Sequence, residues 1–191
     1  MGIILMTINF SFSLSGRFIV SRLISVPTTQ EINKMVSIVI EELNVSSRFL
    51  KTKNFMQHGT ISVYEHCVEV AYTSCHLAAH FKIDVDYWSM IRGALLHDYF
   101  LYDWHVTGDG SHHLHGFTHP KRAFINAVHD LSLNRTERVV ILRHMFPLTP
   151  IPPTNREAWL VCLADKICAT RETLHFTKTK AAIKYGSIRE V

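Results

Sequence analysis

The stretch that decides the fold runs from residue 90 to residue 98 and reads MIRGALLHD. Its apolar residues recur at the three- and four-residue intervals of one face of an α-helix: Met90, Ile91, Ala94 and Leu95. Asp98 continues that face, because it lies seven residues after Ile91, and His97 follows Met90 by seven. A carboxylate and an imidazole are therefore predicted to point inward, where burial costs several kcal/mol unless a partner compensates it.

Outside this stretch the sequence predicts one helix after another, each begun by a capping residue. Four capping boxes mark helix starts: Thr28-x-x-Glu31, Ser62-x-x-Glu65, Asn134-x-x-Glu137 and Thr154-x-x-Glu157. Asp84 or Asp86 can cap the helix that contains Met90, and His119-Pro120 looks like a cap followed by proline at the first helical position. No alternating strand pattern competes, so residues 28–191 are expected to form one all-α domain, a bundle of about six or more helices.

Two segments break the helical pattern. Residues 101–118 contain several histidines and three glycines, which predicts a long His-rich loop that serves as a lid or a binding loop. Residues 1–27 are apolar and Ser-rich, and their two arginines follow the apolar stretch instead of preceding it as in a signal peptide. They are expected to form a weakly ordered leader, with a transit-like leader as the alternative.

Composition narrows the function classes. The 191 residues include 20 Lys and Arg against 16 Asp and Glu, a mild and dispersed excess that gives no indication of nucleic-acid binding. No run reaches the roughly 18 apolar residues of a membrane span, and no Gly-rich phosphate-binding loop occurs. The four cysteines form no Cys-x-x-Cys pair and are predicted to be buried core residues in a reducing, cytoplasmic setting. Histidine is unusual, because 12 of the 13 lie between His58 and His144.

Further polar residues occupy apolar positions of the predicted helices, each three or four residues from an apolar neighbour: His66, His144 and Asp165. Taken singly, an inward histidine is more often a hydrogen-bonded core residue. Taken together with His97 and Asp98, the set favours a divalent metal, for which neutral imidazole and carboxylate are natural ligands. A second His-Asp dipeptide, at residues 129–130, is expected to be a solvated helix end.

This ordered set resembles the HD-domain metal-dependent phosphohydrolases, whose pattern is His … His-Asp … Asp on a helical bundle. The matching residues lie in the segments YEH, ALLHD and LADK, within about residues 35–175: His66, His97, Asp98 and Asp165. Members of the family with two metal ions carry two further histidines, for which His119 and His144 are the candidates. The resemblance implies an HD-domain bundle over residues 28–191 with two divalent transition-metal ions, drawn from Mn²⁺, Fe²⁺, Co²⁺, Ni²⁺ and Zn²⁺.

The activity that the resemblance implies is cleavage of a phosphoester, of a nucleotide or another small phosphorylated metabolite, by a metal-activated water. Asp98 would bridge the ions and, with His97 and Lys121, act in catalysis. Cations and a helix N-terminus favour phosphate, which gives the candidate substrate-binding residues Lys121, Arg122, His115 and Arg143. His58 could sit at the mouth of the site. The Gly-Lys and Gly-Tyr-Pro of the cyclic-di-GMP subgroup are absent, so hydrolysis of a cyclic dinucleotide is not expected.

Two alternatives stay open at this point. The chain could be a non-catalytic HD module that binds a ligand or a partner, or a mixed-valent di-iron oxygenase on the same scaffold, as some members of the family are. The complete ligand set argues against a degenerate module, and a requirement for iron and oxygen would separate an oxygenase from a hydrolase. The expected partner is a small phosphorylated substrate, and the pattern does not specify an oligomeric state.

Overall fold

The computed structural model describes residues 26–105 and 115–186. The predicted leader, apart from its last two residues, and the part of the His-rich loop that contains His112 and His113 lie outside the described residues. The elements are α1 (Thr29–Ser46), a 3-10 helix η1 (Phe49–Asn54), the strands β1 (Met56–His58) and β2 (Ile61–Ser62), α2 (Val63–His80), α3 (Tyr87–Leu96), α4 (His115–Asp130), α5 (Arg135–Arg143) and α6 (Arg156–Gly186). The predicted all-α class is confirmed, with one small antiparallel hairpin added between η1 and α2.

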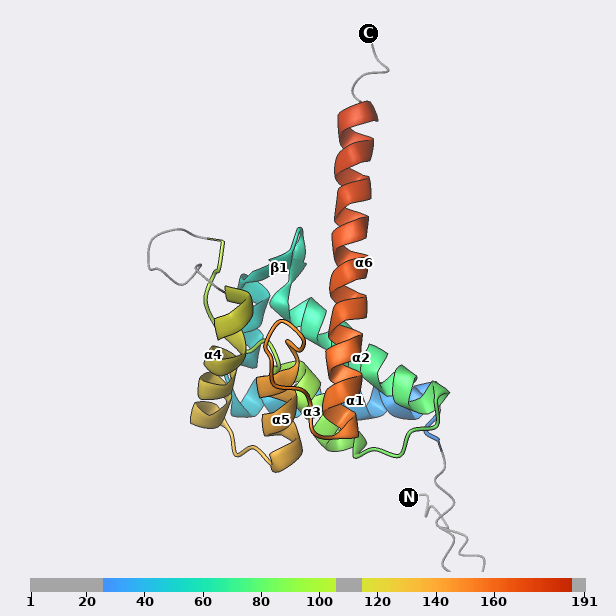
Figure 1. Cartoon of the computed structure of the whole chain (residues 1–191), viewed down its shortest axis with the longest axis vertical. Helices are drawn as coiled ribbons and strands as arrows, with labels where there is room; N and C mark the ends of the chain where they lie inside the picture. The colour runs from blue at the N-terminus through green and yellow to red at the C-terminus, as the bar shows by residue number, and fades with distance from the viewer. Residues whose placement is uncertain (1–25, 106–114, 187–191) are drawn as a thin grey trace, which may run out of the picture.

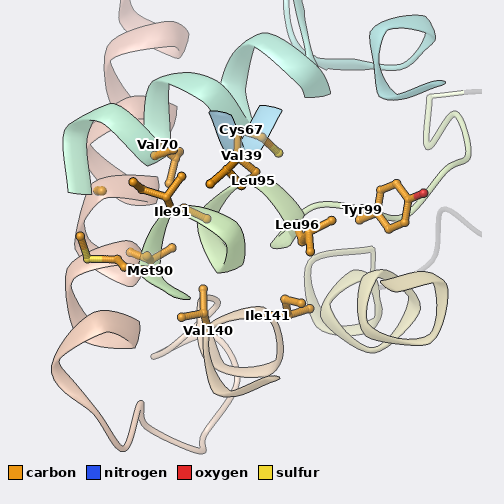
Figure 2. Packing of buried hydrophobic residues seen from close by; sticks show 14 of the residues in the cluster. Val39, Cys67, Val70, Met90, Ile91, Leu95, Leu96, Tyr99, Val140 and Ile141 are labelled. Carbon is orange, nitrogen blue, oxygen red and sulfur yellow. The ribbon is translucent and has the colours of Figure 1, made fainter. Parts of the chain in front are cut away.

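Helix α3 is the centre of the bundle and packs against α1, α2, α5 and α6 (Figure 1). Figure 2 shows Ile91 and Leu95 of α3 facing residues of α1 and α2, namely Val39, Cys67 and Val70, while Val140 and Ile141 approach from α5. All of these side chains are buried, and the four cysteines are buried and free, as predicted. The end of α3, where His97 and Asp98 follow, is therefore held by helices on several sides.

The helix starts follow from local hydrogen bonds. The boxes begun by Thr28, Ser62 and Asn134 are present in full, and Asp86, not Asp84, caps α3 by accepting from the backbone N–H of Ser89. These caps satisfy backbone N–H groups that have no partner within their helix. Because the caps fix where each helix begins, they also fix which residues fall on its buried face.

Two predicted starts are wrong. Helix α4 begins at His115, four residues before His119, and Pro120 lies inside it. Its first turn is held by side chains, since His119 Nδ1 donates to the carbonyl of His115 and the two rings stack 4.7 Å apart. Helix α6 is capped by Asn155, whose Oδ1 accepts from the N–H of Ala158 at 2.9 Å, and not by Thr154. No helix of the described residues is long and apolar enough to cross a membrane.

Close packing of α3 on α5 gives a test of the core. A Cβ added at Gly93 would lie 2.9 Å from Cβ of Val140, an atom that a rotamer change cannot move. Helix propensity favours alanine over glycine by about 1 kcal/mol, but overpacking costs about 1–3 kcal/mol. We expect Gly93→Ala to lower the free energy of unfolding in urea. Val140→Ala removes the Cγ atoms at 3.0 and 3.1 Å but keeps the Cβ at 2.9 Å, so Gly93→Ala should cost less in a Val140→Ala background than in the parent chain without becoming neutral. A stabilised Gly93→Ala protein would contradict this account of the interface.

Candidate metal centre

Six polar side chains from five helices meet beside the end of α3, all at 7 % exposure or less: His66, His97, Asp98, His119, His144 and Asp165. His97 and Asp98 directly follow α3, and His144 directly follows α5. His66 and His119 lie near the starts of α2 and α4, and Asp165 lies on α6. The structure thus brings together every residue that the sequence singled out as a metal ligand.

The carboxylate of Asp98 faces a different set of residues with each oxygen. Its Oδ2 lies 3.4 Å from Nε2 of His97 and 3.9 Å from Nε2 of His66, while its Oδ1 lies 3.1 Å from Nε2 of His119 and 3.5 Å from Nε2 of His144. Asp165 joins the first set, with Oδ1 at 3.1 Å from Nε2 of His66. Two groups of potential metal ligands result, His66–His97–Asp98 and Asp98–His119–His144, and they share Asp98.

The imidazole rings are oriented by hydrogen bonds on the side away from Asp98. Nδ1 of His97 donates to the carbonyl of residue 94 (2.6 Å), Nδ1 of His119 to that of residue 115 (2.9 Å) and Nδ1 of His144 to that of residue 141 (2.9 Å). Carbonyl oxygens only accept, so Nδ1 carries the hydrogen and Nε2 of a neutral ring is left with a free lone pair. Three Nε2 lone pairs are thereby aimed at the carboxylate, the arrangement found where an outer hydrogen bond orients a metal-binding histidine.

A cation fits the space between these atoms. The Nε2 atoms of His119 and His144 lie 2.8 Å apart, and two facing lone pairs at that distance repel unless a positive charge is shared between them. Nε2 of His97 and Oδ1 of Asp98 are buried and have no hydrogen-bond partner among the described residues. Buried polar atoms are rarely left in this state, and a bound ion is one of the few explanations for it. Both groups can therefore hold a divalent metal ion.

The protonation states show how strongly the site attracts positive charge. Burial alone would raise the pKa of Asp98, but the imidazoles of His97, His119 and His144 outweigh it and hold that pKa well below its ordinary value. Burial likewise opposes ionisation of Asp165, yet the hydrogen bond from His66 lowers its pKa. Burial disfavours protonation of His66, but its hydrogen bonds with Asp165 and Glu172 raise the pKa to about 10. In the protein alone, protons supply the charge that a metal ion would supply.

Two further residues of the site were not predicted from the sequence. Glu172 bonds Nδ1 of His66 with both carboxylate oxygens, at 2.9 and 3.1 Å, and Gln57 donates from Nε2 to Oδ2 of Asp98 at 2.7 Å. Glu172 had a readable signal, because it lies seven residues after Asp165 and so on the same helix face. Gln57 gave no such signal in the sequence, because it lies on the short strand β1 and not on a helix face. Its neighbour in the sequence is His58, which was suggested for the mouth of the site.

A cavity of about 820 Å³ opens onto the site. Its polar lining includes Gln57, Asp98, His119 and Asp165, and its other lining residues include Trp104, His115, Gly116, Met145, Pro147, Leu148, Lys166 and Ala169. Volumes of this size are typical of pockets for small organic ligands. The two groups of potential metal ligands thus border a space that a substrate could enter.

The predicted substrate-binding residues take different positions. His115 lines the cavity, stacked on Trp104, and burial together with the neighbouring His119 imidazole lowers its pKa to about 4. Lys121 and Arg122 are exposed on α4, and the Arg122 guanidinium lies over the ring of Tyr102. Arg143 donates to the carbonyl of Pro152. Among the described lining residues, the cation is Lys166.

The second His-Asp dipeptide differs from its predicted state in one of its two residues. The side chain of His129 is exposed, as expected of a solvated helix end, but Asp130 is largely buried and accepts hydrogen bonds from Arg48 and from the hydroxyl of Tyr99. The prediction failed for Asp130 because its partners lie far away in the sequence.

Comparisons of the chain with protein-family models, with curated proteins and with solved structures returned no match. The resemblance to HD-domain phosphohydrolases therefore stays a prediction that rests on the residue pattern. The helical fold and the two His/Asp groups are properties of the structure itself and are compatible with a metal site of that type.

Glu172 provides a test of the orientation of His66. Outer carboxylates on metal-binding histidines typically contribute 10–100-fold to metal affinity, so we expect Glu172→Gln to weaken metal binding by about that factor. The matched control is Glu69→Gln, because Glu69 is an exposed carboxylate that pairs with Arg171 on the surface. Competition with a fluorescent chelator measures both affinities. Equal affinities in the two variants would remove Glu172 from the site.

Metal binding should also release protons. The pKa of about 10 means that His66 is protonated at pH 7, and a metal ion can bind its ring only after that proton leaves. We expect affinity to rise with pH, by up to about tenfold per pH unit for each proton released. Calorimetric titrations in two buffers of different ionisation enthalpy count these protons. Binding heats that do not depend on the buffer would contradict the prediction.

Proposed function

We propose that this protein is a divalent-metal-dependent phosphohydrolase of the HD-domain type, which cleaves a phosphoester of a nucleotide or another small phosphorylated metabolite. The observation that carries the proposal is the position of Asp98, which belongs to both His/Asp groups and also lines the cavity. A carboxylate that belongs to two adjacent groups of potential ligands, at the edge of a substrate-sized space, suits hydrolysis by two metal ions.

The donor set suits divalent transition metals. Asp98 would serve both ions, one with His66, His97 and Asp165 and the other with His119 and His144. Imidazole and carboxylate donors in this mixture favour Mn²⁺, Fe²⁺, Co²⁺, Ni²⁺ or Zn²⁺ over the all-oxygen sites of Mg²⁺ and Ca²⁺. When bound, such ions supply Lewis acidity, lowering the pKa of water and neutralising the oxygens of a phosphoryl group.

The chain's own groups have definite parts in this reaction. Asp98 stays ionised because the surrounding imidazoles lower its pKa, and Gln57 fixes its Oδ2 by the 2.7 Å hydrogen bond. The other amide atom, Oε1 of Gln57, is buried and has no hydrogen-bond partner among the described residues. Because this oxygen is buried, Gln57 acts through Asp98, whose carboxylate it holds in place beside the cavity.

The decisive experiment is reconstitution followed by a hydrolysis assay. Purified protein is stripped with a chelator, reloaded with each of the five metals, and assayed for phosphate release from an aryl phosphate and from a panel of nucleotides and phosphorylated metabolites. We expect activity in the reloaded protein and a loss of at least about 10³-fold in Asp98→Asn, with the helical circular dichroism unchanged. Retained turnover in Asp98→Asn would overturn the proposal.

The second His-Asp dipeptide supplies a matched control. His97→Gln should abolish turnover, whereas His129→Gln, the same change at the exposed dipeptide, should leave turnover and metal content unaltered. Two other outcomes would replace the proposal. Activity that requires iron and consumes oxygen would identify an oxygenase, and tight metal binding without turnover of any substrate would identify a regulatory module.

A further inference from the structure

A second cavity lies beside the start of α6. Its volume of about 470 Å³ is within the range of pockets that bind small organic molecules. Its described lining comes from the segment between α2 and α3, the segment after α5 and α6 itself, and it includes apolar side chains and an arginine: Ile83, Phe146, Trp159, Leu160, Leu163 and Arg156. This space is distinct from the cavity at the metal groups, although Pro147 and Lys166 line both.

The ring of Trp159 leaves part of its surface uncovered at this cavity. It meets Phe146 edge to face, with ring centroids 5.4 Å apart and an angle of 80° between the planes. Such a contact covers one face of one of the two rings, so Phe146 leaves Trp159 at least one face. Trp159 is 46 % exposed, and Leu163, four residues further along α6, is 49 % exposed. A ligand with an apolar body would therefore remove water from carbon surface that the fold leaves accessible.

Arg156 brings a positive charge to the same cavity. It is the exposed first residue of α6, and its Nη1 donates to the backbone carbonyl of Asp84 at 3.1 Å. This bond uses one of the five N–H donors of the guanidinium, and Arg156 forms no ion pair with a described residue. A carbonyl has no net charge, so the charge of Arg156 is not neutralised there. A guanidinium presents its N–H donors as a planar fork that matches a carboxylate.

Lys166 has a different part at this cavity. Its ammonium donates to the carbonyl of His144 at 2.8 Å and lies 3.3 Å from both the carbonyl and Sγ of Cys162. Three acceptors match the three hydrogens of an ammonium, and Oδ2 of Asp165 lies 3.9 Å away as a counter-charge. Lys166 is therefore engaged in holding the segment after α5 to α6, and Arg156 is the group that can receive an anion.

From the uncovered ring and the guanidinium we infer a second ligand site, in which the cavity binds a carboxylic acid with an apolar body. The body would lie against Trp159 and Leu163, and the carboxylate would pair with Arg156. Exposed apolar surface also suits a second copy of the chain, but the unneutralised charge at the cavity favours an anion. The inference goes beyond the proposed function and does not depend on it.

The experiment separates the contribution of the body from that of the charge. Calorimetry on metal-loaded protein measures the binding of 2-naphthylacetate, of its uncharged amide 2-naphthylacetamide, and of acetate. We expect the naphthylacetate to bind at least about fivefold more tightly than the amide, because a carboxylate forms charge-assisted hydrogen bonds with a guanidinium. We expect acetate to bind at least about tenfold more weakly than naphthylacetate, because acetate has no ring to bury.

Two pairs of variants locate the bound acid. Trp159→Ala should weaken naphthylacetate by about fivefold or more, whereas Trp104→Ala, at the cavity beside the metal groups, should leave it unchanged. Arg156→Gln should abolish the preference for the acid over the amide. Its control is Arg138→Gln, because Arg138 is also exposed and also donates to a backbone carbonyl, that of Leu133, on a different helix. Thermal unfolding of each variant establishes that the fold is intact.

Three results would overturn the inference. Equal binding of the acid and the amide would remove the pairing with Arg156. Binding that Trp104→Ala weakens and Trp159→Ala does not would place the acid at the metal groups instead. Self-association in sedimentation that Trp159→Ala abolishes, without binding of the acid, would assign this face to a second copy of the chain. None of these results bears on metal-dependent hydrolysis, which the assay of Asp98→Asn tests separately.

Discussion

The carboxylate of Asp98, at 2 % exposure in the middle of a helical bundle, is the charge around which the site is organised. Withdrawing an anion from water costs several kcal/mol even after relaxation, and hydrophobic packing cannot repay that cost. The compensation comes from four imidazoles whose Nε2 atoms lie within 3.9 Å of its oxygens: His66, His97, His119 and His144. Neutral imidazoles alone leave the negative charge in place, so the arrangement is complete only with protons or metal ions.

The helix ends explain how the rings are held so close together. The last carbonyls of a helix have no partner within it, and His97 and His144 satisfy two such carbonyls with Nδ1, at residues 94 and 141. One hydrogen bond thus caps the helix and also sets the tautomer that turns Nε2 toward Asp98. Because α3 packs directly on α5, the two ends lie side by side, and their rings meet edge to face at 4.8 Å. Secondary structure and site geometry are therefore products of the same contacts.

Periodicity explains why much of this could be predicted. A polar residue on an apolar helix face must be buried if the helix is buried, which is why His66, Asp98 and Asp165 could be placed inward from spacing alone. The residues that escaped prediction act through contacts that spacing does not report. Gln57 reaches the site from a two-stranded hairpin with no alternating pattern, and the start of α4 depends on ring stacking near its first turn. Tertiary contacts of this kind override local signals such as a proline.

The two His-Asp dipeptides of the chain show why a motif has to be judged by its surroundings. Asp130 accepts two hydrogen bonds from the Arg48 guanidinium, at 2.8 and 2.9 Å, and one from the Tyr99 hydroxyl at 2.6 Å, so its charge is paired within the protein. Asp98 also follows a histidine. Its Oδ1 has no hydrogen-bond partner among the described residues, and the groups paired with it there are imidazoles, not a guanidinium. A carboxylate that already has a cation is a structural ion pair. A buried carboxylate surrounded by imidazole lone pairs is completed by a cation from outside the chain, and that difference, not the dipeptide itself, is what marks residues 97–98 as a site of chemistry.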